Sequence, residues 1–246
     1  MEINHIGILS AMPEEVGETV SHLKDVSEIK YGDLTLFKGY YITGKEKLFV
    51  TLAWSGWGKV SAARAITRLI ASNTSQNKVD LIIFTGVAGA ANKDLKQWDF
   101  VISKEIIQYD FDASPLFPKY VIPALNKSKL VCKEELLNIG YSAVMRTIEM
   151  NPFLNKNKVV KGLIATGDKF ISDKSTLNNL SNSINNIDAV EMEGGAIAQV
   201  ATQEKIPWLV VRTISDSADE GASVEFSEFI KKYKNLSWCF INNFLE

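Results

Sequence analysis

The chain has 246 residues, of which 46% are hydrophobic and 23% charged, and 27 basic against 29 acidic residues give a formal net charge of −2. This length and composition suit one large globular domain, and the absence of a long basic cluster argues against a nucleic-acid partner. The longest apolar run, residues 81–92, is too short and too rich in glycine for a membrane span, and the N-terminus lacks the basic segment of a secretory signal.

Apolar strands alternate with segments of helical spacing along the chain. In the first half we predict a strand, a helix, a two-stranded hairpin turning at residues 43–46, a second helix and two more strands, over residues 3–9, 13–23, 34–42, 48–54, 61–72, 79–84 and 100–107. The second half predicts a loop, a helix, a strand, a helix with a surface turn, a strand, a helix, a strand and a final helix, over residues 115–127, 130–139, 159–166, 178–186, 187–190, 194–204, 207–214 and 224–245. This alternation predicts a single α/β domain over residues 1–246 with a mostly parallel or mixed central sheet.

Polar or glycine-rich segments repeatedly follow the predicted strands. They cover residues 12–15, 56–59, 86–89, 167–171, 191–193 and 215–216. Sheet topology can bring such strand ends into one crevice, where glycine lets the backbone approach a ligand closely. The sequence therefore predicts one ligand site at an edge of the sheet.

Two glycine-rich segments invite a nucleotide interpretation that their spacing does not support. Gly56-Trp57-Gly58-Lys59 has Ala53 where a Walker motif needs glycine and Val60 where it needs serine or threonine. Residues 85–89 do not form a dinucleotide fingerprint either. Hydrolysis of nucleoside triphosphates and dinucleotide binding are therefore excluded.

Cysteine and histidine are too sparse to suggest a metal site. Cys132 and Cys239 lack metal-ligand spacing and fit a reducing compartment such as the cytoplasm. His5 and His22, far apart in sequence, argue against a zinc site or a histidine-based triad.

Six motifs taken together resemble one known family. Residues 11–16 (AMPEEV), 55–60 (SGWGKV), 85–89 (TGVAG), 167–171 (GDKFI), 190–193 (VEME) and 212–216 (RTISD) occur in the order found in the 5′-methylthioadenosine/S-adenosylhomocysteine nucleosidases, within the purine nucleoside phosphorylase-like superfamily. The resemblance extends from about residue 3 to 244 and implies a three-layer αβα sandwich with a central mixed, twisted sheet. It also implies a homodimer and cleavage of an adenine nucleoside to adenine and a 5-modified ribose.

The resemblance implies a general acid and a base for water. Cleavage passes through an oxocarbenium-like transition state, for which carboxylates are suited. Asp216 matches the acid that protonates adenine N7, and Ser215 beside it would orient the carboxyl. Glu15, and not the adjacent Glu14, matches the residue that activates water. From the residues alone, Asp216 can equally cap a helix, and Glu14 and Glu15 can be first-turn helix acids.

The same resemblance implies the substrate-binding residues. Glu193 matches the residue that holds the ribose hydroxyls, and Met192 would pack against the sugar. Phe170 would stack on adenine, or serve only as a core aromatic, and the Ile171 backbone would read the base edge. Glu191 is assigned a supporting role, as is Arg212, which we expect to pair with a nearby acid.

The chain departs from the family pattern at several positions of the expected site. Val87 stands where serine is usual, which removes a hydroxyl near the nucleophile pocket. Trp57 stands where an aliphatic residue is usual, in the expected 5′-substituent pocket. Phe226 matches another wall of this pocket. Phe117, on a loop altered at residues 118–119, would reach the active site of a dimer partner. The preferred substrate is therefore open.

We expect an N-ribosyl hydrolase that releases adenine from 5′-methylthioadenosine, S-adenosylhomocysteine or 5′-deoxyadenosine. No metal or organic cofactor is implied, and the expected partners are a small adenine nucleoside and a second copy of the chain. Three alternatives stay open: an aminodeoxyfutalosine or futalosine hydrolase, a phosphorylase of the same superfamily, and a non-catalytic nucleoside-binding protein. Arginines are absent from the glycine-rich segments, which argues against phosphate as the nucleophile.

Overall fold

Strands and helices alternate along the chain in the computed structural model, which describes residues 3–44, 46–74 and 77–246. The strands are β1 (His5–Ser10), β2 (Lys24–Tyr31), β3 (Leu34–Thr43), β4 (Glu46–Trp54), β5 (Leu81–Ala90), β6 (Phe100–Gln108), β7 (Lys129–Val131), β8 (Val159–Thr166), β9 (Ile187–Glu191) and β10 (Trp208–Asp216). The α-helices are α1 (Thr19–His22), α2 (Lys59–Ala71), α3 (Glu134–Met150), α4 (Lys174–Ser183), α5 (Gly194–Gln203) and α6 (Ala222–Leu245), and short 3-10 helices cover Pro13–Glu15 (η1) and Pro152–Leu154 (η2).

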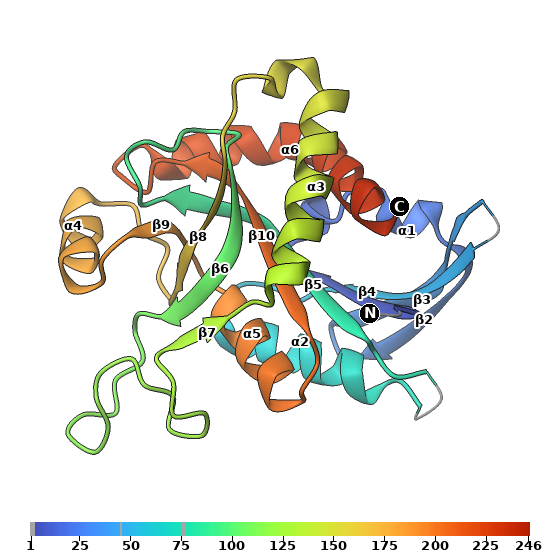
Figure 1. The fold of residues 1–246 in the computed structure, drawn as a ribbon, viewed down its shortest axis with the longest axis horizontal. Helices are drawn as coiled ribbons and strands as arrows, with labels where there is room; N and C mark the ends of the chain where they lie inside the picture. Colours follow the sequence, from blue (N-terminus) through green and yellow to red (C-terminus); the bar gives the residue numbers. More distant parts are fainter. Residues whose placement is uncertain (1–2, 45, 75–76) are drawn as a thin grey trace.

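The strands form one mixed sheet in the order β10-β6-β8-β9-β5-β1-β4-β3-β2 (Figure 1). Strand β5 also pairs in parallel with β10, so β5, β9, β8, β6 and β10 close into a ring. Strands β5 and β9 are antiparallel and meet at their C-terminal ends, where Gly89 pairs with Val190. The closed ring therefore brings the C-terminal ends of β5, β9 and β10 to one place.

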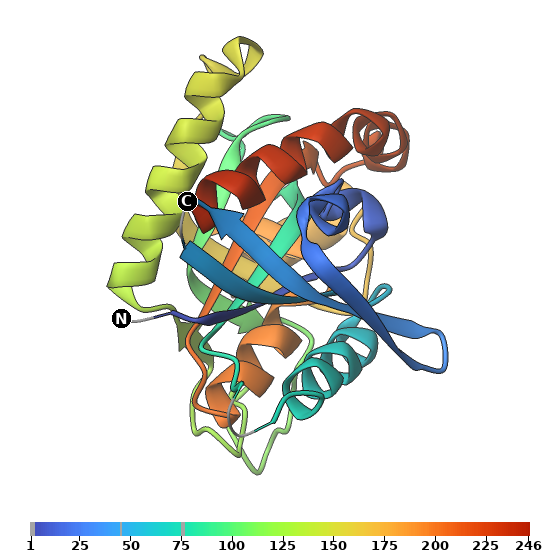
Figure 2. The same ribbon diagram turned by 90° about the vertical axis from the view of Figure 1, so that its right-hand side faces the viewer.

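Helices cover the sheet on two sides (Figure 2). Helices α2 and α5 pack together on one side, and α3 and α6 pack together on the other. All residues of β1, β5 and β10 are buried, as expected for strands covered on both faces. The predicted mixed sheet and layered α/β fold are confirmed. In the described part of the chain, no helix is long and apolar enough to cross a membrane.

The predicted helix over residues 13–23 is wrong. The chain forms the short helix η1, breaks, and forms the four-residue helix α1. The break lies at Gly17, whose φ of +54° favours glycine and whose missing Cβ makes room for the carbonyl oxygen of Lys234 in α6. Contact with α6 thus overrides the local helical pattern.

Other boundaries differ where exposure hid the pattern. Strand β2 was not predicted, because it is an exposed edge strand in which charged residues replace the apolar alternation. The helix predicted over 130–139 begins after strand β7 and continues to Met150 as α3. The helix and surface turn predicted over residues 178–186 correspond to α4, which begins four residues earlier, at Lys174. Strands β3 and β4 form the predicted antiparallel pair, and Lys45, in the predicted turn, lies outside the described residues.

Two strands extend further than predicted. Residues 85–90, interpreted as a loop after a strand, belong to β5, and Ser215 and Asp216 belong to β10. The glycines at 86 and 89 are therefore strand residues that leave space beside the sheet, not turn residues. This places Val87 and Asp216 on rigid elements, which position side chains better than loops do.

Candidate functional site

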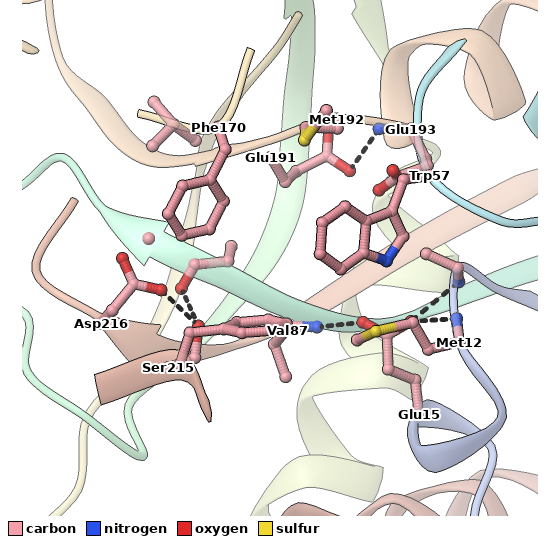
Figure 3. A pocket seen from close by; sticks show the side chains of 15 residues that line it. Met12, Glu15, Trp57, Val87, Phe170, Glu191, Met192, Glu193, Ser215 and Asp216 are labelled. Carbon is pink, nitrogen blue, oxygen red and sulfur yellow. Dashed lines mark hydrogen bonds between the residues drawn. The ribbon is translucent and has the colours of Figure 1, made fainter. Parts of the chain in front are cut away.

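One cavity, open to solvent, lies at the C-terminal ends of β1, β5, β9 and β10 (Figure 3). Its walls come from residues spread over most of the sequence: Ala11, Met12, Glu15, Trp57, Val87, Ala88, Gly89, Phe170, Val190, Glu191, Met192, Glu193, Ser215, Asp216 and Phe226. The predicted convergence of strand ends on a single crevice is confirmed.

Most of the residues singled out in the sequence line this cavity. They are Glu15, Trp57, Val87, Phe170, Met192, Glu193, Ser215, Asp216 and Phe226. Ile171 lines a smaller hollow that shares Phe170, Met192 and Asp216 with the main cavity. Phe117 is absent from both linings and is 37% exposed, so its role toward a partner subunit stays a prediction.

Glu15 is buried and held in one orientation by backbone N–H groups. Its Oε2 accepts hydrogen bonds from the N–H groups of Ala11 and Met12, each 2.8 Å long, and its Oε1 accepts one of 2.9 Å from the N–H of Val87. Burial raises the pKa of Glu15, while Arg212 and these N–H groups oppose the rise. Glu14 has no such setting, so the structure distinguishes the two neighbouring acids.

Arg212 is the only cation in contact with the carboxylates behind the cavity, within the described residues. It is fully buried, and its guanidinium pairs with Glu191 and lies 3.5 Å from Glu193 Oε2 and 3.9 Å from Glu15 Oε1. The same group lies over the Phe84 ring, 4.2 Å from its centroid. Nearby acids raise the pKa of Arg212, against the effect of burial. The predicted pairing of Arg212 with an acid is confirmed.

Glu191 uses its oxygens within the protein. Its Oε2 accepts hydrogen bonds from the N–H groups of Glu193 (3.1 Å) and Gly194 (2.7 Å) at the start of α5, and its Oε1 accepts one from the Thr166 hydroxyl. Glu191 therefore fixes the start of the helix, which agrees with the supporting role expected for it.

Glu193 occupies the N-cap position of α5, but its side chain makes no capping hydrogen bond. Its Oε1 accepts a hydrogen bond of 2.7 Å from the Gly58 N–H, and the side chain forms part of the cavity wall. Burial, reinforced by the charge of Glu191, raises the pKa of Glu193 to about 8, although Arg212 opposes the rise. One arginine among three carboxylates leaves excess negative charge, which a proton on Glu193 relieves.

The titration of Glu193 is expected to make the protein less stable as pH rises. Its pKa is raised from 4.5 to about 8 on folding, so the folded state binds more protons between these values. Its stabilising contribution is complete below the unfolded pKa and is lost as pH rises through the folded one. Glu193→Gln keeps an acceptor but cannot titrate. Between about pH 5 and 8, the thermal midpoint of the unmodified protein should fall more steeply than that of the variant; parallel curves would contradict this.

Asp216 occupies the opposite end of the cavity from the Glu15 carboxylate (Figure 3). Its Oδ2 accepts a hydrogen bond of 2.7 Å from the Ser215 hydroxyl and its Oδ1 accepts one of 2.9 Å from the Ala218 N–H. Burial raises the pKa of Asp216, while these two hydrogen bonds oppose the rise. Because α6 begins only at Ala222, Asp216 is not a helix N-cap.

Three aromatic rings form one wall of the cavity. Phe226 lies between Phe170 and Trp57, with both ring centroids 6.0 Å from its own and with nearly perpendicular ring planes. Edge-to-face pairs of this kind are favourable beyond the area they bury. Phe170 is thus a cavity residue and not only a core aromatic.

Several supporting residues were missed in the sequence. Gly86 leaves the space that the Glu15 carboxylate and the Arg212 guanidinium occupy. Asp168 accepts a 2.7 Å hydrogen bond from the Lys59 N–H, and Asp110 pairs with the Lys59 ammonium at 2.6 Å. Gly86 could have been found from the sequence, because a glycine within a strand is a sign that another group approaches the backbone closely. The contacts of Asp110 and Asp168 with Lys59 depend on tertiary structure.

No group of three or more histidine, cysteine, aspartate or glutamate side chains is arranged to hold a metal ion within residues 3–44, 46–74 and 77–246. Cys132 and Cys239 are free thiols.

Comparison with known proteins gives consistent matches over nearly the whole chain. Residues 5–240 match the model of the phosphorylase superfamily. A 5′-methylthioadenosine/S-adenosylhomocysteine nucleosidase of Haemophilus influenzae is 35% identical over 226 residues, which cover 92% of this chain and 91% of the relative. An aminodeoxyfutalosine nucleosidase of Campylobacter jejuni is 33% identical and covers 96% of each chain.

Solved structures agree with these matches. The 5′-methylthioadenosine/S-adenosylhomocysteine nucleosidase of Neisseria meningitidis, in complex with methylthio-immucillin-A, superposes with a TM-score of 0.86 at 28% identity and covers 99% of each chain. A futalosine hydrolase of Helicobacter pylori gives a TM-score of 0.83 at 30% identity, covering 99% of this chain and 97% of its own. The chain belongs to the 5′-methylthioadenosine/S-adenosylhomocysteine nucleosidase family of the phosphorylase superfamily.

Proposed function

We propose that the protein hydrolyses the N-ribosidic bond of 5′-methylthioadenosine and related adenine nucleosides and releases adenine. The observation that carries this proposal is the pair of buried carboxyl groups, Asp216 and Glu15, at opposite ends of one cavity. Burial raises the pKa of both groups, but of the two Glu15 lies beside the cation Arg212 and accepts three backbone hydrogen bonds, which favour its ionised form. The names of the relatives support the same activity.

In this proposal Asp216 acts as the general acid. Its raised pKa favours the protonated carboxyl, which donates its proton to adenine N7 as the bond between C1′ and N9 breaks. The electron pair of that bond goes to the base, and the ribosyl group becomes oxocarbenium-like. Phe170 stacks on the adenine ring, and the backbone of Ile171 reads the base edge.

Glu15 supplies the nucleophile in the same scheme. It accepts three backbone hydrogen bonds, which favour its ionised form, and it takes a proton from the water that attacks C1′. Glu193 holds the ribose hydroxyls and Met192 packs against the sugar. Glu191 and Arg212 keep these carboxylates in place through the contacts described above.

The cavity gives no support to phosphate as the nucleophile. Phosphate sites use arginine, lysine or several converging donors, and no basic residue lines the cavity among the described residues. Arg212 lies behind three carboxylates, and Val87 supplies no hydroxyl. A non-catalytic nucleoside-binding protein does not require two buried carboxyl groups at opposite ends of its cavity.

Release of free adenine from 5′-methylthioadenosine tests the proposed function. We expect adenine and 5-methylthioribose to form at the same rate with and without inorganic phosphate, because water is the nucleophile. Chromatography of the sugar product distinguishes a free sugar from a sugar phosphate. Formation of a phosphorylated sugar, or a dependence of the rate on phosphate, would contradict hydrolysis, and binding without any product would favour the non-catalytic alternative.

We also infer a cytoplasmic homodimer that acts in nucleoside catabolism and methionine salvage. The two free thiols suit a reducing compartment. The family resemblance supports the dimer, in which Phe117, exposed on its loop, would contribute to the active site of the partner subunit.

A further inference from the structure

We propose that Trp57, backed by Phe226, makes this protein selective for adenine nucleosides whose 5′ substituent is short and carries no carboxylate. The proposal rests on the proposed function, which places the base near Asp216 and the ribose near Glu193 and Glu15. It goes further because it sorts the candidate substrates: 5′-methylthioadenosine and 5′-deoxyadenosine are accepted, and S-adenosylhomocysteine and nucleosides with a 5′ carboxylate are disfavoured.

The lining left over for the 5′ substituent is apolar. In the proposed function, base and sugar account for the acidic groups, Phe170 and Met192. The large side chains that remain in the lining are Met12, Trp57 and Phe226, with the smaller Val87 beside them. A thioether or a methyl group suits such a wall.

Trp57 is at the mouth of the cavity. Its side chain lines the cavity, and yet the residue is 53% exposed. Figure 3 shows the indole ring pointing into the space bordered by Phe170, Val87 and Met12. Phe226 meets the indole with its ring plane at 90°. A long 5′ substituent therefore has to displace the indole or pass beside it.

The loop that carries Trp57 is fastened on both sides. Gly56 and Gly58 have φ values of +80° and +89°, a conformation that favours glycine. The Gly58 N–H donates to Glu193 and the Lys59 N–H donates to Asp168, each over 2.7 Å. A Cβ on Gly58 would lie 3.0 Å from Asp168 Oδ1. These restraints fix the backbone that carries Trp57, so displacing the indole ring costs part of the substrate's binding free energy.

Charge acts in the same direction as shape. The cavity lining contains the carboxyl groups of Glu15, Glu191, Glu193 and Asp216 and no basic side chain among the described residues. A carboxylate brought in on the substrate meets no basic side chain in this lining and loses hydration against an apolar wall.

Two lysines in the segments that carry Trp57 and Phe170 have acidic partners of their own. Lys59 pairs with Asp110 at 2.6 Å. Lys169 lines the hollow on the adenine side and contacts the Thr176 hydroxyl and Asp173 in or beside helix α4. Neither is placed to neutralise a carboxylate near Trp57.

The test compares kcat/KM for adenine release from 5′-methylthioadenosine, 5′-deoxyadenosine and S-adenosylhomocysteine. We expect the unmodified protein to prefer the first over the last by at least about tenfold, a usual scale for discrimination by pocket shape. Trp57→Leu should reduce that preference by about tenfold, mainly through a lower KM for S-adenosylhomocysteine. Trp57→Phe, which keeps a smaller ring, should fall between the two.

Val60→Ala is the matched control. Val60 lies three residues after Trp57 in helix α2 and is 81% exposed, and its substitution should leave the preference unchanged. Equal use of the substrates by the unmodified protein, or an unchanged preference in both Trp57 variants, would overturn the inference. Thermal melting checks that the variants fold, and if Trp57→Leu does not, Trp57→Phe decides. Absence of adenine from every substrate with the unmodified protein would instead refute the proposed function.

Discussion

Replacing Asp216 with asparagine is expected to lower kcat for adenine release by about 10²–10⁴-fold, the usual contribution of a general acid. The carboxyl is 4% exposed and its pKa is raised by burial, so it can keep a proton near neutral pH. Asparagine has nearly the same shape and can still accept the hydrogen bond from the Ala218 N–H. It has no acidic proton to give to the leaving base, so activity is lost while the fold is retained.

The Ser215 hydroxyl explains how Asp216 can both hold and release a proton. The hydroxyl oxygen lies 2.7 Å from Asp216 Oδ2 and 3.3 Å from the carbonyl oxygen of Ala88. When Asp216 is ionised, the hydroxyl donates to the carboxylate. When Asp216 is protonated, the hydroxyl can turn and donate to Ala88. Both protonation states are therefore satisfied without movement of the backbone.

Asp219→Asn is the matched control for this prediction. Asp219 lies three residues further along, accepts a hydrogen bond of 3.1 Å from the Gly221 N–H and pairs with Lys174 outside the cavity. The same change of aspartate to asparagine there should alter kcat by less than a few-fold. Initial rates of adenine release and thermal midpoints measured for both variants make the comparison. An Asp216→Asn protein with kcat within about tenfold of the unmodified protein would refute the role of Asp216.

The sequence predicts the fold well where strands are buried and helices amphipathic. The apolar runs of β1, β5 and β10 and the helical spacing of α2 and α6 follow from burial on both faces of a sheet or on one face of a helix. Prediction failed where a distant contact decides the conformation. Gly17 ends the first helix because α6 approaches it, and strand β2 forms by pairing with β3 despite its charged sequence.

The site is predictable as a set of residues but not as a geometry. Glu15, Glu193 and Asp216 stood out because acidic residues follow predicted strands, and family order separated Glu15 from Glu14. Only the structure shows that Glu191 fixes the start of α5 while Glu193 binds the Gly58 N–H. The different roles of Glu191 and Glu193 depend on which backbone N–H groups lie within hydrogen-bond distance of each side chain in the folded chain. No sequence pattern encodes this.

Arg212 connects stability to the arrangement of the proposed active site. It is fully buried, and the carboxylates of Glu15, Glu191 and Glu193 surround its guanidinium. Burying three acids beside one cation costs free energy of folding, because each buried charge loses its hydration. All three carboxylates border the cavity, where the proposed reaction uses Glu15 and Glu193. Arg212 therefore supplies the positive charge that stabilises these buried carboxylates.

Arg212→Met is expected to destabilise the protein by about 3–5 kcal/mol, because it leaves buried carboxylates without a cation. For a chain of this size that corresponds to a fall of roughly 6–20 °C in the thermal midpoint. Without the guanidinium the folded-state pKa values of Glu15 and Glu193 rise further above their unfolded values. The folded state then gains protons as pH falls, so the loss should be greatest above about pH 8 and smaller near pH 5.

Arg64→Met separates this effect from the general cost of losing an arginine. Arg64 makes an ion pair of 2.8 Å with Asp33, but the two side chains are 41% and 89% exposed, and exposed pairs of this kind contribute about 0–1 kcal/mol. Thermal midpoints of both variants, measured across the same pH range, give the comparison. Two results would contradict the prediction: a thermal midpoint of Arg212→Met as high as that of Arg64→Met, or the same loss of stability at every pH. Either would mean that the buried carboxylates do not depend on Arg212, and the proposed account of how Glu15 and Glu193 are held would fail.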